Sequence, residues 1–176
     1  MSEEILARTR ETSTARTPAL EDVFKASYRR LVVQLYGVVG DLAEAEDLVQ
    51  EAFVRAAASG RKFLAVDNPE AWLRRTAINL HRNRWRKLRN FSRIKHRLEN
   101  PTDPPELEEH VVVIEALRSL PEAQRQAMAL YYLADLPVED IAATLGCAVG
   151  TVKSRLGRGR EAMALVLGPA EGSSDA

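Results

Sequence analysis

Apolar residues recur every three or four positions along most of this chain, which is the period of an amphipathic helix rather than of a strand. The first two such stretches run from about residue 18 to 39 and from 41 to 59, and Gly40 and Gly60 end them. Asp41, with Glu44 three residues later, is typical of a capping box at the start of the second helix. No stretch alternates apolar and polar residues as a strand does, so the pattern predicts an all-α fold.

A third helix is predicted to begin at Asn68, whose side chain can cap the first free amides, with Pro69 in the first turn. A short loop over residues 61–67 is expected before it. Helical spacing gives this helix one apolar stripe, formed by Leu73, Ala77, Leu80 and Leu88. It gives another face to four polar residues at positions i, i+4, i+7 and i+11, namely Arg75, Asn79, Arg82 and Arg86.

The pattern in the second half of the chain predicts four more helices, separated by short turns. They are expected at 107–120, from 121 to a turn at 135–137, at 138–145, and at 149 to about 167. A tight turn containing Gly146 separates the last two. A short helix, a glycine turn and a longer basic helix are typical of a helix-turn-helix, although a plain αα-hairpin gives the same pattern.

Composition divides the chain into two lobes. Pro101, Pro104 and Pro105 interrupt the helical pattern, and residues 99–115 contain six acidic residues and no Lys or Arg. We therefore expect a disordered leader at 1–17, an N-terminal lobe at 18–97, an acidic linker at 98–109, a helix-turn-helix lobe at 110–168 and a disordered tail at 169–176.

Length and composition narrow the class of protein. The 176 residues, with 45% hydrophobic and 28% charged, suit one ordinary or two small globular domains. No signal peptide or membrane-spanning run is present, so we expect a cytoplasmic protein without membrane insertion of its own. The single Cys147 and three scattered histidines predict no metal site or cofactor, and no arrangement of catalytic residues predicts an enzyme.

Charge changes the interpretation of the third helix. The whole chain balances 25 basic against 25 acidic residues, yet residues 61–97 hold twelve Lys or Arg against Asp67 and Glu70, a net charge of +10. A solvated face usually mixes signs, so this one-sided charge favours a nucleic-acid surface. Trp72 and Trp85 on the same helix could stack on bases, but each fits core packing at least as well.

Three segments together resemble the small extracytoplasmic-function (ECF) members of the bacterial sigma-70 family. They are Asp47-Leu48-Val49-Gln50-Glu51-Ala52-Phe53, then Asn68-Pro69-Glu70-Ala71-Trp72-Leu73 followed by Ala77-Ile78-Asn79, and Leu120-Pro121 through Val149-Gly150-Thr151-Val152-Lys153-Ser154-Arg155-Leu156. The resemblance implies a sigma factor without a catalytic site. It implies that the protein binds core RNA polymerase, directs it to promoters and helps to melt the DNA.

The resemblance also implies roles by position in the N-terminal lobe. By pattern alone, the acidic face with Asp47, Gln50 and Glu51 is equally well a solvated surface. The resemblance implies that this face docks on the β′ clamp helices. The minus-ten element would be read and melted by Trp72, Arg75, Asn79, Arg82 and Arg86. Asn79 matches the position beside a pocket for a flipped base, where an amide offers both a donor and an acceptor. The loop from Gly60 to Asp67 would complete that pocket.

In the second lobe, the resemblance places the minus-thirty-five element against the last helix. The implied contacts are Thr151, Lys153, Ser154, Arg155, Gly157, Arg158 and Arg160, with Arg155 and Arg160 holding phosphates. Gly157 and Gly159 are departures, because each glycine inside a helix costs about 1 kcal/mol relative to alanine. Pro137 stands where the short helix usually has a Ser or Thr cap.

Further partners follow from the resemblance alone. The β flap of polymerase and an anti-sigma factor are expected to bind, and the acidic linker would pass through polymerase toward the RNA exit channel unless it is only a solubilising spacer. The competing function is a free-standing helix-turn-helix repressor with a ligand-sensing first lobe. Such a lobe has no use for twelve basic residues, which favours the sigma factor.

Overall fold

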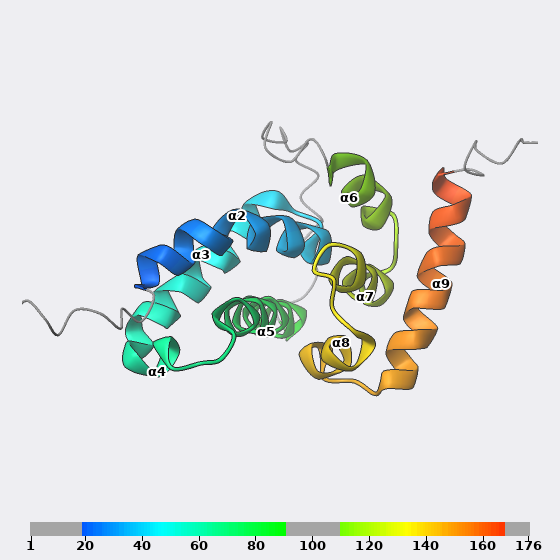
Figure 1. The fold of residues 1–176 in the computed structure, drawn as a ribbon. Helices are drawn as coiled ribbons and strands as arrows, with labels where there is room; N and C mark the ends of the chain where they lie inside the picture. Colours follow the sequence, from blue (N-terminus) through cyan, green and yellow to red (C-terminus); the bar gives the residue numbers. More distant parts are fainter. Residues whose placement is uncertain (1–18, 91–109, 168–176) are drawn as a thin grey trace, which may run out of the picture.

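A computed structural model describes residues 19–90 and 110–167. As the sequence predicts, these residues form helices and no strands. The leader, the acidic linker and the tail that the sequence predicts lie outside them, as do residues 91–97. The helices are α2 Leu20–Val39, α3 Leu42–Ser59, α4 Arg61–Leu64, α5 Pro69–Asn90, α6 Val111–Arg118, α7 Glu122–Tyr132, α8 Val138–Leu145 and α9 Val149–Leu167 (Figure 1).

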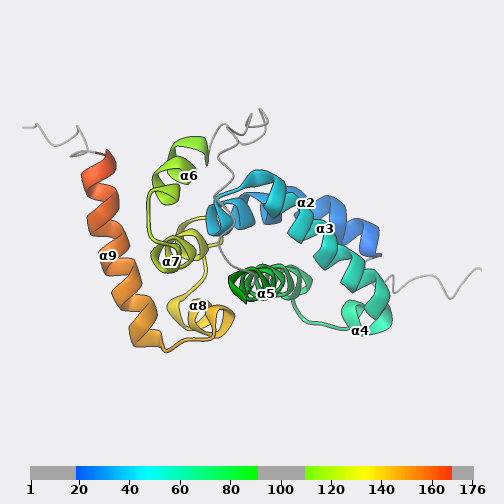
Figure 2. The ribbon, with the colours of Figure 1, turned by 180° about the vertical axis from the view of Figure 1, so that it is seen from behind.

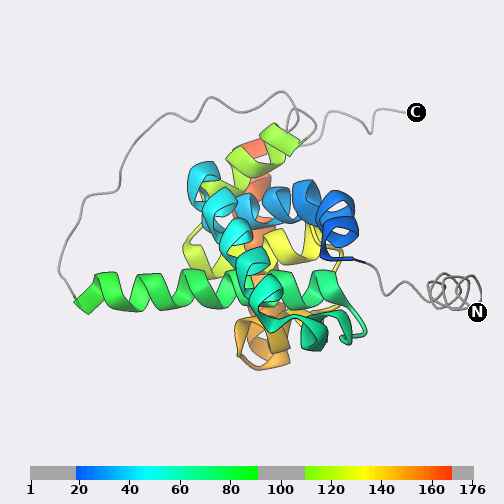
Figure 3. The same ribbon diagram turned by 90° about the vertical axis from the view of Figure 1, so that its left-hand side faces the viewer.

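The N-terminal lobe consists of α2 to α5. Helices α2 and α3 form a hairpin because Gly40 ends α2 in the left-handed conformation (φ 83°) and the Asp41 side chain accepts a hydrogen bond from the Glu44 amide at 2.7 Å. Helix α5 runs across this hairpin as a long straight rod (Figure 3). Leu73, Ala77 and Leu80 face the hairpin and are buried, as the apolar stripe predicts.

The C-terminal lobe consists of α6 to α9, with α7 at its centre. Five consecutive residues of α7 are buried because neighbours cover the helix on several sides: Gln126, Ala127, Met128, Ala129 and Leu130. The bounds of α8 and α9 agree with the prediction, and Gly146 turns the chain between them in the left-handed conformation (φ 65°). Seen from behind, α9 lies along the outer side of α7 and α8 (Figure 2).

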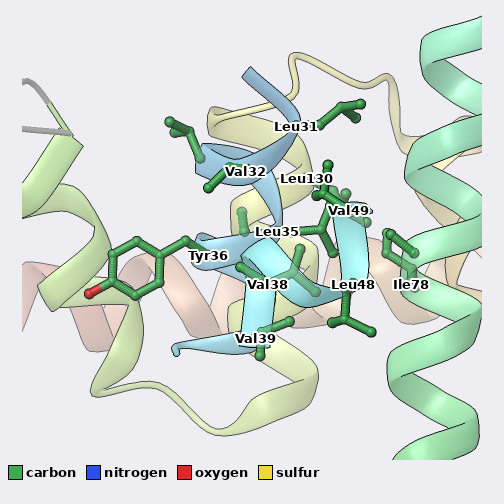
Figure 4. Close-up of a cluster of buried hydrophobic side chains, with 14 of the residues drawn as sticks. Leu31, Val32, Leu35, Tyr36, Val38, Val39, Leu48, Val49, Ile78 and Leu130 are labelled. Carbon is green, nitrogen blue, oxygen red and sulfur yellow. The ribbon is translucent and has the colours of Figure 1, made fainter. Parts of the chain in front are cut away.

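The two lobes share one hydrophobic core. Helix α2 packs against α3 on one side and against α7 on another, so its C-terminal half, from Leu31 to Val39, is buried throughout. The close-up shows Leu130 of α7 in the same cluster as Leu35 of α2, Val49 of α3 and Ile78 of α5 (Figure 4). The tertiary structure thus joins two lobes that composition alone divides.

One prediction is wrong in the segment before α5. Residues 61–67 were expected to form a loop, but residues 61–64 form the single helical turn α4. Phe63 explains the difference, because its side chain is buried and the amides of Phe63 and Leu64 both donate to the Gly60 carbonyl. None of the helices in residues 19–90 and 110–167 is long and apolar enough to cross a membrane.

Candidate nucleic-acid and polymerase surfaces

Helix α5 presents the four polar residues of the candidate minus-ten surface to solvent. Asn68 caps the helix as predicted, since its side chain accepts a hydrogen bond from the Ala71 amide at 2.9 Å. Burial of the apolar stripe then fixes the rotation of the helix. The opposite positions are exposed in consequence: Arg75, Asn79, Arg82 and Arg86.

Two arginines of α5 instead form hydrogen bonds with other side chains of the N-terminal lobe. Arg74 is buried, and it donates to Gln34 of α2 at 2.8 Å and to Glu70 at 3.2 Å. Arg84 donates to Glu51 of α3 at 2.8 Å. The net charge of the segment therefore overstates the number of arginines that are free to meet a nucleic acid.

The two tryptophans of α5 differ in their surroundings. Trp72 is half-buried, and its ring lies edge-on to Phe63 with the centroids 5.1 Å apart, so it anchors α4 to α5. Trp85 lies in the C-terminal part of α5, and 39% of its surface is exposed. Of the two alternatives that the sequence left open, the structure gives Trp72 a packing partner and leaves the Trp85 ring accessible for stacking.

The candidate polymerase surface lies on α3. Asp47 and Gln50 are exposed, and the Gln50 amide donates to the Tyr28 hydroxyl at 3.3 Å. Glu51 is half-buried and already paired, with Arg84 at 2.8 Å and with Arg55 at 3.0 Å. The hydrogen bond from Arg84 is the largest of the influences that lower the pKa of Glu51. Glu51 therefore links α3 to α5 through Arg84, and it is also one of the three residues of the candidate polymerase surface.

Glu70, which the sequence identified only as a charge near the helix start, is the centre of a second network. It accepts hydrogen bonds from Arg74 and from Arg30 of α2, whose Nε lies 3.0 Å away. Burial by itself favours the protonated carboxyl, but the two guanidinium groups outweigh it and lower the pKa of Glu70. Burial lowers the pKa of Arg74. The i, i+4 spacing of Glu70 and Arg74 is a local signal for part of this network, but no local signal could have revealed Arg30 and Gln34, because they lie on another helix.

Helix α9 presents most of the candidate minus-thirty-five residues. Thr151, Lys153, Ser154, Arg158 and Arg160 are exposed, and Arg155 and Gly157 are half-buried. The start of α7 and the first half of α9 enclose a hollow whose lining includes Pro121, Gln124, Thr151, Ser154, Arg155 and Arg158. Hydroxyl and guanidinium donors side by side in a hollow suit phosphate oxygens and base edges.

Two of these arginines have partners within the lobe. Arg155 donates to the Cys147 sulfur at 3.7 Å, across the turn before α9. Arg160 donates to the Tyr132 hydroxyl at 2.9 Å, and its guanidinium lies 5.3 Å from the centre of the Tyr131 ring. The bond to Tyr132 is the main cause of the raised pKa of Arg160. Both arginines are thus held in place on α9.

The two glycines of α9 have different surroundings. A Cβ at Gly157 would meet no atom within 4 Å, so its missing side chain leaves open space on the candidate DNA face. A Cβ at Gly159 would lie 2.7 Å from Met128 Cγ, because α7 and α9 cross closely there. Packing therefore explains Gly159, and nothing in the described structure requires Gly157.

Candidate metal sites are absent from the part of the chain that the structure describes. No three His, Cys, Asp or Glu side chains there come together in a way that could hold an ion. Cys147 is a free thiol, half-buried in the turn before α9.

Each of the two lobes matches a known protein-family model. The family model Sigma-70 region 2 matches residues 23–91, and the model Sigma-70, region 4 matches residues 110–163. The ECF RNA polymerase sigma factor EcfG of Rhodopseudomonas palustris (strain TIE-1) is 34% identical over 159 residues, which cover 86% of this chain and 86% of that protein. The ECF RNA polymerase sigma factor SigW of Bacillus subtilis (strain 168) is 33% identical over 154 residues, which cover 77% of this chain and 82% of that protein.

Solved structures give the same result. The sigma factor RpoE in complex with the anti-sigma factor NepR, from Bartonella quintana, is 28% identical with a TM-score of 0.62, and the match covers 84% of this chain and 95% of that one. CnrH in complex with the cytosolic domain of CnrY has a TM-score of 0.55 at 22% identity, over 93% of this chain and 95% of that one. At 22% identity, the similarity to CnrH shows a shared fold.

Proposed function

This chain belongs to the sigma-70 family and is a sigma factor of the ECF type, and we propose how its surfaces divide the work of transcription initiation. The N-terminal lobe binds core RNA polymerase through α3 and reads the minus-ten element through α5. The C-terminal lobe reads the minus-thirty-five element through α9 and contacts the β flap. The observation that carries this proposal is an exposed basic face on α5 in the same chain as a helix-turn-helix.

The division of the chain into residues 18–97, 98–109 and 110–168 is part of the proposal, as are the residue roles. Asp47, Gln50 and Glu51 contact the β′ clamp helices. Asn79 receives a flipped base of the minus-ten element, with arginines of the same face on the phosphates. Exposure of Asp47, Gln50 and Asn79 supports these roles, because each side chain is accessible without any change in the fold.

A free-standing repressor is disfavoured, because both lobes match sigma-70 regions and the relatives are named as sigma factors. Members of this family are in general not enzymes, and no catalytic activity is indicated. The protein acts on RNA polymerase, so we place it in the cytoplasm. An anti-sigma factor is a further proposed partner, since a related sigma factor was solved in complex with one.

Run-off transcription tests the function directly. Core RNA polymerase is supplied with a promoter template, with and without the protein, and the length and amount of transcript are measured. We expect transcripts of one defined length only when the protein is present. A protein that binds the same promoter tightly without polymerase and represses a second sigma factor would contradict the proposal in favour of a repressor.

A further inference from the structure

Trp85 of α5 carries an exposed aromatic ring that the fold does not use. Two other aromatic side chains are exposed, but each is paired with a second ring. Phe24 stacks on Tyr28 with the centroids 4.6 Å apart. Tyr132 lies edge-on to Tyr131 at 4.9 Å. In the part of the chain that the structure describes, Trp85 has no ring partner and does not pack against the hydrophobic core. Tryptophan is among the residues that most often carry binding energy at interfaces, so this ring is a candidate contact.

The surroundings of Trp85 are cationic. Arg86 and Lys87 follow it along the chain, and both are exposed. No Asp or Glu occurs between Glu70 and Glu99 in the sequence. Figure 3 shows the C-terminal end of α5 projecting beyond the hairpin of α2 and α3, so this part of the helix is open to a partner. An aromatic ring among arginines and lysines suits a single-stranded nucleic acid, whose bases stack on the ring and whose phosphates pair with the cations.

Trp85 continues a row of exposed side chains along α5. Residues three apart are neighbours on a helix surface, and Asn79, Arg82 and Trp85 follow one another at this spacing. All three are exposed. Trp85 lies about 9 Å from Asn79 along the helix axis, at about 1.5 Å per residue. Three stacked nucleotides cover about the same length, at about 3.4 Å each. A strand that meets Asn79 with one base can therefore place a phosphate at Arg82 and another base at Trp85.

We propose that Trp85 stacks on an unpaired promoter base within about three nucleotides of the base that Asn79 receives. The proposal rests on the proposed function and adds a second base site to the minus-ten surface. This site is separate from Trp72, whose ring lies against Phe63 near the start of the helix.

Stacking gives Trp85 a different task from that of Asn79. An amide distinguishes bases through its hydrogen bonds, whereas every base has a face that can stack. Removing a base from the duplex costs free energy, and a new stacking partner offsets part of that cost. Trp85 therefore helps to keep the strand unpaired, and it accepts any of the four bases at its position.

Templates that lack single bases identify the partner of Trp85. Holoenzyme is assembled from core polymerase and either the wild-type protein or Trp85→Ala, and single-round run-off transcription is measured below saturation. Each template carries one abasic site, placed at successive positions of the minus-ten element in either strand. On the intact template we expect about tenfold less transcript from Trp85→Ala, since stacking on one base contributes a factor of this order. At one abasic position the wild type should fall by a similar factor and Trp85→Ala should fall no further, because the same contact is already lost.

Three results would overturn the proposal. Equal amounts of transcript from the wild type and Trp85→Ala on the intact template would show that the ring contributes nothing. A loss in Trp85→Ala that is the same on every abasic template would show that the ring has no base partner. Weaker binding of Trp85→Ala to core polymerase in the absence of DNA, by the same factor as the loss of transcript, would assign the ring to a protein contact instead.

Companion variants separate stacking from bulk and from stability. Trp85→Phe keeps an aromatic ring and should recover most of the transcript, whereas Trp85→Leu keeps only apolar bulk and should not. Recovery by Trp85→Leu would contradict stacking, and this variant carries the abasic test if urea unfolding shows that Trp85→Ala is less stable. Leu165→Ala on α9 removes a side chain that is 88% exposed and should transcribe like the wild type. A wild-type protein that supports no transcript rejects the proposed function, whereas transcription that does not depend on Trp85 rejects only this inference.

Discussion

At the scale of single residues, the fold separates side chains that the sequence makes look alike. Arg74 and Arg75 are neighbours in a basic helix, yet Arg74 is buried beside Gln34 and Glu70 whereas Arg75 is exposed. Charge counts treat the two as equal. Burial decides that only Arg75 is available to a phosphate.

Asn79 is the residue on which base recognition should depend most. Replacing it with alanine removes an exposed amide without touching the core, so the protein should keep its stability and its general affinity for DNA. A good base contact contributes about 1–3 kcal/mol, so transcription should lose tenfold or more of its discrimination at one minus-ten base. Run-off assays on promoters substituted at each minus-ten position measure this. Equal losses at every position would show that Asn79 positions only the DNA backbone.

The two glycines of α9 give a matched pair of stability predictions. Gly157→Ala should stabilise the protein by about 1 kcal/mol, because alanine favours the helix and its Cβ meets no neighbour. Gly159→Ala should destabilise it by about 1 kcal/mol or more, because overlap with Met128 outweighs the same helical gain. Urea unfolding measures both. Equal shifts in the two variants would contradict the close crossing of α7 and α9.

At the scale of elements, ion pairs fasten α5 to the hairpin that it crosses. Glu70→Gln should cost about 2 kcal/mol at neutral pH, because it leaves the buried Arg74 guanidinium with Gln34 as its main remaining partner. Chemical unfolding of the variant beside the wild type measures this loss. Gln keeps the shape of the side chain, so the change isolates the charge.

The same variant predicts a dependence on pH. The lowered pKa of Glu70 means that its stabilising effect is present above the ordinary value of 4.5 and is lost as the pH falls below it. The stability difference between wild type and Glu70→Gln should therefore shrink when unfolding is measured at pH 3 instead of pH 7. A difference of the same size at both pH values would show that the carboxylate charge contributes nothing.

Helix α3 carries the prediction for polymerase binding. Asp47→Ala combined with Gln50→Ala should weaken binding to core polymerase with little loss of stability, because both side chains are exposed and neither belongs to an ion pair that the structure describes. Glu139→Ala on α8 removes one exposed charge elsewhere and serves as the control. Co-purification with core polymerase that is the same for the double variant and the control would reject α3 as the contact.

At the scale of the whole molecule, the shared core predicts that the two lobes unfold together. Both tryptophans lie in the N-terminal lobe, and the only cysteine, Cys147, lies in the C-terminal lobe, so tryptophan fluorescence and a dye on Cys147 report separately. Because Leu130 packs into the same core as Leu35 and Val49, the two signals should change at the same urea concentration. Two separate midpoints would show that the lobes are independent.

The sequence by itself determined the features that depend on near neighbours along the chain. Helical periodicity, the Asn68 cap and the Gly146 turn specified the all-α fold, the start of α5 and the bounds of α8 and α9, because caps and turns act within about four residues. The resemblance to sigma factors came from motifs of the same short range. The buried turn α4 was missed because Phe63 is held by Trp72, on the next helix.

Only the tertiary structure decided which residues work together across distance. Arg74 is fixed by Gln34, forty positions away, and Arg125 by carbonyls more than eighty positions away. Gly37 lies in the last turn of α2, where a Cβ would overlap Leu133 Cδ1 and lie 3.1 Å from Ala129 Cβ of α7, so the need for a glycine there arises only because α7 crosses α2. Burial and pairing depend on the positions of groups brought together by folding, and these are not encoded in the spacing of any one segment.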